Sequence, residues 1–266
     1  MHSADSLVTT LFAQTRAAAL AGDDDGRWNC VVELQGMGSE AVFRRAVEWC
    51  VSPVAMERAI GADVLAQLRE NGESISFRER AVPHVAALLR DSDAAVLAAA
   101  TVALSHLGVR DQLAAVVALA THAVADVRYG VVLALSGNDT PLAIATLIRL
   151  STDDDETVRD WATFGLGSQT DVDTLELRNA LAARLEDTNA EARAEAIVGL
   201  ARVGDARAHV PILEDLRSAS VGRLVVQAAR DFPSPAFLDA LLMLKTWWDV
   251  DSELLESAIA RCRAIE

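Results

Sequence analysis

Aromatic residues are scarce in this sequence, at 5% of 266 residues, and proline, glycine and cysteine are also few. With only 6 Pro and 14 Gly beside 52% hydrophobic residues, the chain is too apolar for a disordered or low-complexity protein. The three cysteines, Cys30, Cys50 and Cys262, lie far apart and form no Cys-x-x-Cys pair. This pattern argues against a disulfide framework or a zinc site and fits a reducing compartment.

Long hydrophobic runs and targeting signals are missing as well. No window reaches the roughly 18 uncharged apolar residues that a transmembrane helix needs, and a run such as 113–125 is too short. The first residues contain neither the basic region nor the apolar segment of a signal peptide. We therefore expect a cytoplasmic protein that makes no membrane contact.

Positive charge is the next shortage. The chain has 24 Lys and Arg against 39 Asp and Glu, which gives a formal net charge of −15. Such a chain repels nucleic acid and anionic membranes unless its few cations cluster, so nucleic-acid binding is not expected. The same charge favours a basic protein partner.

Catalytic and metal-binding signatures are also lacking. The sequence contains no GxSxG, GxxxxGK[ST], GxGxxG or HExxH, and no histidine pairs with a cysteine at ligand spacing. Two acidic clusters, 23–25 and 153–156, lack calcium-loop spacing. Both precede predicted helices, where carboxylates cap free N–H groups. We expect no catalytic residue, no cofactor and no metal, and hence no enzyme.

What the sequence does contain is an internal repeat. The segment 131–136 aligns with 162–167 at an offset of 31 residues, and further copies extend in both directions. The longest spacing between copies includes the polar stretch 70–80, which predicts a longer loop. The equivalent position in seven successive units is occupied by Arg27, Arg58, Leu97, Arg128, Arg159, Arg193 and Gly222.

Each repeat contains two apolar runs of helical period. In the second run of one unit, Val158, Ala162, Thr163 and Leu166 fall at i, i+4, i+5 and i+8, which is one face of a helix. First helices are predicted near 5–21, 39–51, 81–90, 110–121, 141–151, 173–186, 206–217 and 234–247. Second helices are predicted near 25–36, 54–69, 94–107, 126–136, 156–167, 190–203, 220–230 and 251–264.

These runs predict an all-α fold, an α-solenoid of about eight stacked antiparallel helix pairs. We expect one domain over 1–266, with clear repeats at 20–230 and C-terminal capping helices at 233–266. Because no long period-2 run lies between turn signals, no β-sheet is expected. One of Trp247 and Trp248 should complete the core of the last helix pair.

The units at 126–135, 157–167 and 192–200 resemble HEAT repeats, of the short bacterial type also seen in phycobilisome-lyase subunits. The resemblance implies a ladder in which the repeated arginine pairs with an acidic residue of the adjoining repeat. Leu97 and Gly222 depart from the pattern, so the ladder is expected to break there. The resemblance does not specify a function, because HEAT repeats serve many. The ladder positions are Arg27, Arg58, Arg128, Arg159 and Arg193.

The family binds ligands on the concave face, which is lined by second helices. Positions beside the core set therefore give the candidates for partner binding. Tyr129, Trp161 and Phe164 concentrate the scarce aromatics in two neighbouring units, where exposed rings would anchor a partner. The sequence equally allows Trp161 and Phe164 to pack between adjacent second helices. The full candidate set is Trp28, Asp63, Tyr129, Trp161, Phe164 and Glu195.

The favoured hypothesis is a non-catalytic protein–protein interaction module or scaffold, which binds a basic protein through its concave face. One alternative is a nucleic-acid glycosylase resembling the DNA-alkylation-repeat enzymes, which needs a basic face to meet phosphates. The other is a bilin lyase or isomerase subunit, which follows from the type of repeat.

Overall fold

The computed structural model describes residues 2–68 and 76–265 of the chain. Over these residues it contains sixteen α-helices and no strand, which confirms the all-α prediction. The packing divides the chain into two compact units, 1–135 and 136–266. The expectation of one domain over 1–266 stays a prediction.

The first unit holds four helix pairs. The first helices are α1, α3, α5 and α7, and the second helices are α2, α4, α6 and α8; η1 continues α5, and η2 and η3 flank α7. Their bounds are α1 His2–Ala21, α2 Asp24–Met37, α3 Glu40–Cys50, α4 Ala55–Ala66, α5 Ser76–Ala87, η1 Leu88–Arg90, α6 Ala94–Leu107, η2 Arg110–Gln112, α7 Leu113–Ala118, η3 Leu119–Thr121 and α8 Ala125–Leu135.

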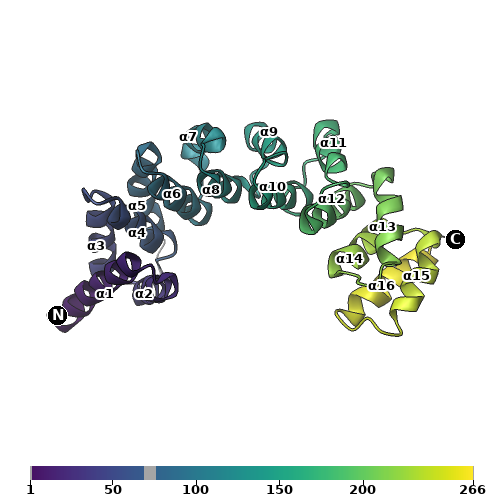
Figure 1. The fold of residues 1–266 in the computed structure, drawn as a ribbon, viewed down its shortest axis with the longest axis horizontal. Helices are drawn as coiled ribbons and strands as arrows, with labels where there is room; N and C mark the ends of the chain where they lie inside the picture. The colour runs from purple at the N-terminus through teal and green to yellow at the C-terminus, as the bar shows by residue number, and fades with distance from the viewer. Residues whose placement is uncertain (1, 69–75, 266) are drawn as a thin grey trace. The chain divides into compact units, whose positions relative to one another are not determined.

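The second unit holds the other four pairs. Figure 1 shows α9 and α11 together on one side of α10 and α12, and the contacts between these helices agree. The bounds are α9 Pro141–Leu150, α10 Glu156–Ser168, α11 Leu175–Ala183, α12 Ala190–Arg202, η4 Ala206–Ala208, α13 His209–Leu216, α14 Arg223–Asp231, η5 Pro235–Phe237, α15 Leu238–Leu244 and α16 Ser252–Arg263.

Polar residues at the predicted boundaries start these helices. Asp93 accepts hydrogen bonds from the first-turn N–H groups of α6, and Asp155 does the same for α10. Asp23 accepts from Gly26 N at 2.9 Å at the start of α2. Each carboxylate satisfies N–H groups that have no partner inside the helix. Both acidic clusters of the sequence thus supply helix caps.

The core lies where the helical period places it. Val158, Ala162, Thr163 and Leu166 are all buried, and so are the equivalent residues of α6, α8 and α12. Second helices pack in series, α2 to α8 in the first unit and α10 to α16 in the second. Trp248 is buried and donates its indole N–H to the Val221 carbonyl at 2.7 Å, whereas Trp247 is half-exposed.

The predicted loop at 70–80 is wrong over its last residues, because α5 begins at Ser76. Phe77 stacks on Phe43 of α3 at 5.4 Å between ring centroids, and Arg80 lies 4.1 Å over the Phe43 ring. These contacts with the preceding pair extend the helix to the N-terminal side of its apolar run. Residues 70–75 lie outside the described part of the chain.

Candidate functional site

The repeated arginines connect successive repeats. Arg58 of α4 bonds Asp91 through two nitrogens, at 2.6 and 2.8 Å, and also donates to the Ser52 carbonyl at 3.0 Å. Arg159 of α10 repeats this arrangement with Asp187 and with the Asp153 carbonyl. In both cases the arginine connects the loop before its own helix to the end of the first helix of the next repeat. Such two-pronged pairs are geometrically specific.

The other ladder arginines vary the same theme. Arg193 bonds Asp215 at 2.5 Å and the Leu185 carbonyl at 3.0 Å. Arg128 donates to the His122 carbonyl at 2.9 Å, the same offset of six residues as in Arg58 and Arg159. Arg27 instead reaches Asp63 on the next second helix, at 2.8 Å.

The ladder was expected to break at Gly222, but the next residue continues it. Arg223, the first residue of α14, bonds Asp251 of the following pair at 3.1 Å. A shift of one residue moves the cation around the helix, and this arginine is more exposed than those of the ladder. At the other departure, Leu97 is buried, so an apolar contact stands where the arginine would be.

A groove of about 440 Å³ lies on the second helices of the first unit. We call it the α2–α8 groove. Four alanines of α4 and α6 leave room along it, namely Ala59, Ala95, Ala98 and Ala99. Trp28 from α2, Met56 from α4 and Tyr129 from α8 add large side chains to the lining. The groove therefore combines space above small residues with aromatic rings, as partner-binding surfaces do.

Trp28 packs against the side chain of its neighbour Arg27. It is 43% exposed, and the Arg27 guanidinium lies 4.5 Å from its ring centroid. Arg27 is in turn fixed by its bond to Asp63. An exposed tryptophan with a fixed neighbour loses little conformational freedom on binding, which favours its role as an anchor.

The charges on the groove are mostly negative. Asp24, Asp63 and Asp126 line it, against the single cation Arg27. Asp24 and Asp126 are exposed, and Asp24 also lies 3.8 Å from the Arg27 guanidinium, whereas Asp63 is only 8% exposed and is bonded to Arg27 at 2.8 Å. Burial raises the pKa of the Asp63 carboxyl, and the Arg27 charge opposes that effect. Asp63 therefore lines the groove as a carboxylate held by Arg27, and its part in partner binding stays a prediction.

The structure thus brings three of the predicted residues, Trp28, Asp63 and Tyr129, onto one groove. Sequence reasoning missed Asp126 and the alanines, and it explained Asp24 only as part of a helix-capping cluster. A signal was present, because Ala95, Ala98, Ala99 and Val102 recur at helical spacing beside the core set of α6. Small residues at such positions leave a channel open between neighbouring helices.

The remaining candidates lie in the second unit. Trp161 is 37% exposed on α10 and packs edge-to-face on Phe164, with 5.6 Å between ring centroids. The two rings contact each other within α10 while Trp161 stays partly exposed, so the role of this pair as a partner anchor stays a prediction. Glu195 of α12 is only 9% exposed and accepts a hydrogen bond from the Ser168 hydroxyl at 2.6 Å. Its carboxylate is thus engaged inside the unit, and its part in partner binding stays a prediction.

The buried carboxylate of Glu195 leads to a pH-dependent prediction. Burial is the largest cause that raises its pKa, and Asp160 adds repulsion, whereas the Ser168 bond lowers the pKa. An acid whose folded pKa lies above its unfolded value costs stability once the pH rises above these values. Glu195→Gln is expected to raise the urea midpoint at pH 7 and to leave it unchanged at pH 4. A lower midpoint at pH 7 contradicts this reasoning.

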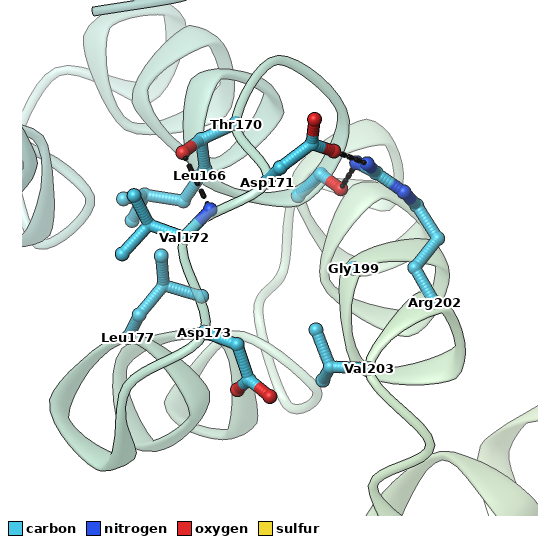
Figure 2. A pocket seen from close by; sticks show the side chains of 10 residues that line it. Leu166, Thr170, Asp171, Val172, Asp173, Leu177, Gly199, Arg202 and Val203 are labelled. Carbon is cyan, nitrogen blue, oxygen red and sulfur yellow. Dashed lines mark hydrogen bonds and ion pairs between the residues drawn. The ribbon is translucent and has the colours of Figure 1, made fainter. Parts of the chain in front are cut away.

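A second hollow, of about 380 Å³, lies between α10, α12 and the connection to α11 (Figure 2). Its three charged side chains are all engaged: Arg202 donates to the Gly167 carbonyl at 2.7 Å and to Asp171 at 3.0 Å, and Asp173 accepts from Arg178 at 2.6 Å. The Val172 N–H bonds the Thr170 hydroxyl at 3.0 Å. These bonds fix the connection between the helices, so we assign the hollow a structural role.

The described residues form neither a metal-ligand cluster nor a membrane-spanning helix. Nowhere in 2–68 and 76–265 do three or more His, Cys, Asp or Glu side chains gather in a way that could hold a metal ion. Within the same part of the chain, every helix is too short or too polar to cross a bilayer.

Comparison with known proteins agrees with the repeat pattern. A family model described as HEAT repeats matches residues 81–167. Protein YibA of Escherichia coli K12 is 26% identical over 239 residues, which cover 88% of this chain and 83% of YibA. The X-ray structure of Escherichia coli YibA aligns with a TM-score of 0.74 at 24% identity, over 97% of this chain and 96% of that one.

Other solved structures align with lower TM-scores and lower sequence identity. Human deoxyhypusine hydroxylase aligns at a TM-score of 0.37 and 18% identity, covering 98% of this chain and 97% of its own. A designed armadillo repeat protein in complex with the peptide (KR)4 aligns at 0.48 and 18% identity, over 84% of this chain and 100% of its own. These scores are too low to transfer any property. The family match confirms the predicted HEAT repeats over 81–167, and the stacked helix pairs of the structure confirm the solenoid fold.

Proposed function

We propose that this chain, a HEAT-repeat α-solenoid, is a non-catalytic interaction module that binds a basic protein through the α2–α8 groove. The observation that supports the proposal most is the lining of that groove. Trp28 and Tyr129 lie on it together with the exposed carboxylates of Asp24 and Asp126. Aromatic anchors with complementary charge around them are typical of protein-binding surfaces.

The arrangement of the arginines favours a protein partner over nucleic acid. Arg27, Arg58, Arg159 and Arg193 are each bonded to a carboxylate of another helix or repeat. A nucleic-acid surface needs cations that are available to phosphates, and these four are engaged within the solenoid. A basic partner meets no such obstacle, because the net charge of −15 attracts it.

The test is affinity capture from a lysate of the source cell with matched tryptophan variants. Trp28→Ala combined with Tyr129→Ala is expected to weaken binding of the captured protein at least about tenfold, because a few aromatic anchors commonly dominate interface energy. Trp247→Ala is the control, since Trp247 is a half-exposed tryptophan outside the groove. Equal capture by wild type and the double variant refutes the proposal that the partner binds through the groove. Circular dichroism must show equal folding.

The charge of the groove can be tested separately. Asp24→Asn with Asp126→Asn is expected to slow association and to reduce its salt dependence, whereas dissociation changes less. Asp154→Asn with Asp249→Asn is the matched control, because both residues are exposed and lie outside the groove. Equal effects of the two variants mean that only the overall charge matters. The double variant Trp161→Ala, Phe164→Ala tests whether the α10 face also contributes to binding of the captured protein.

A further inference from the structure

The α2–α8 groove offers few partners to an extended peptide backbone. Its polar side chains lie on α2 and α8, in Asp24, Arg27, Trp28, Asp126 and Tyr129. The α4 and α6 residues between them are Ala, Met, Ile and Val, apart from the paired Asp63. The first-turn N–H groups of α6 are already bonded to Asp93, at 2.9 and 3.4 Å. Arg27 is bonded to Asp63. An extended segment leaves its own N–H and C=O groups without hydrogen bonds wherever it covers these apolar side chains.

A helix avoids this cost because its backbone groups bond within the segment. The described part of the chain also has no strand to which an extended peptide could be added, so strand addition does not apply and the apolar groove favours the helix-in-groove mode. The alanines of α4 and α6 give the groove a floor of small side chains into which a ridge of bulky residues fits.

The length of such a helix follows from the spacing of the second helices. The groove takes residues from α2, α4, α6 and α8, so an occupant crosses three spacings between neighbouring helices. At about 8–10 Å each, these add up to about 24–30 Å. At 1.5 Å per residue, the occupant needs about 16–20 helical residues.

The charges of the groove indicate which charged residues the incoming helix carries. Asp24 of α2 and Asp126 of α8 lie at opposite ends of the series of second helices and are both exposed. Basic side chains that flank the apolar stripe of an incoming helix can reach them, whereas acidic ones are repelled. Resting on the proposed function, we infer that the groove binds an amphipathic α-helix of a partner protein, with a bulky apolar stripe flanked by Lys or Arg.

The test is a selection from a displayed library of random peptides of about 20 residues, the length derived above. Binders to the wild-type protein are counter-selected against the Trp28→Ala, Tyr129→Ala variant. The inference expects enriched sequences with apolar residues at i, i+3 or i+4, and i+7, with an excess of Lys and Arg. Enriched peptides without this period, enriched acidic peptides, or no peptide that prefers wild type would each overturn it.

Variants of the selected peptides then test whether binding requires the helical conformation. A central proline is expected to weaken binding at least about tenfold, because it breaks the helix without changing the charge. Trp247→Ala in the protein is expected to leave binding unchanged. Equal binding of the proline variant overturns the inference while leaving the proposed function in place, since groove-dependent capture of a protein from lysate is measured independently.

Discussion

Replacing Arg58 by methionine is expected to lower the free energy of unfolding by about 2–3 kcal/mol. Methionine keeps part of the apolar stem but leaves the Asp91 carboxylate and the Ser52 carbonyl without their guanidinium donors. The Asp91 side chain is 9% exposed. Removing one partner of a fully buried pair costs about 3–5 kcal/mol, and the slight exposure of this pair reduces the figure. Urea unfolding followed by circular dichroism measures the loss.

The effect should also depend on pH. Hydrogen bonding from Arg58 is the largest cause that lowers the pKa of Asp91 below its usual value. A carboxyl whose folded pKa is lowered contributes stability above its unfolded pKa and loses that contribution as the pH falls through the folded one. The difference between wild type and Arg58→Met is therefore expected to shrink in acid. A difference that stays constant down to pH 2 would falsify the assignment to this pair.

A surface arginine in the same unit provides the control. Arg45 pairs with Glu48 at 3.1 Å, and both side chains are well exposed. Arg45→Met is expected to change stability by no more than about 0.5 kcal/mol, because exposed pairs contribute little. Similar losses from both substitutions would mean that the ladder position has no special role.

Gly199→Ala has the second large expected effect. A Cβ at Gly199 would lie 2.6 Å from the Gly167 Cα and 2.7 Å from Leu181 Cδ1. The first of these atoms belongs to the backbone of α10, so the two helices must separate. Overpacking of this kind costs about 1–3 kcal/mol. Gly167→Ala is expected to act similarly, since its Cβ would lie 2.5 Å from the Glu195 carbonyl oxygen.

The control for Gly199 is a helical glycine with space around it. Gly36 of α2 has no atom within 4 Å of an added Cβ. Gly36→Ala is therefore expected to raise stability by up to about 1 kcal/mol through helix propensity. Both substitutions add the same methyl group within a helix, so the difference between them isolates the packing cost. If Gly199→Ala is as stable as Gly36→Ala, α10 and α12 are not in the close contact described.

The helices and the core could be predicted because their signals are local. Asp155 and Asn189 cap α10 and α12 where the sequence places helix starts. The i, i+4, i+5, i+8 period identified Val158, Ala162, Thr163 and Leu166 as buried. A cap acts within one turn, and a period is a property of one helix, so both can be read without knowing the neighbours. The start of α5 could not be predicted, because Phe77 in its first turn stacks on Phe43 of another helix.

The candidate site could be predicted only in part. The helical period placed Trp28 and Tyr129 on the exposed side of second helices, and both line the groove. It could not foresee that Asp63 is paired with Arg27 and that Glu195 is engaged by Ser168. The exposure of a side chain depends on residues about 30 positions away, whose distance the period does not give.

The sequence by itself determined the helix pairs, their caps and the positions of the repeated arginines, because these follow from patterns within one repeat. Only the tertiary structure decided that the alanines of α4 and α6 form the floor of a groove. It also decided that Arg223 continues the ladder past Gly222. Both depend on how side chains of successive repeats meet, which is set by the spacing and rotation of packed helices.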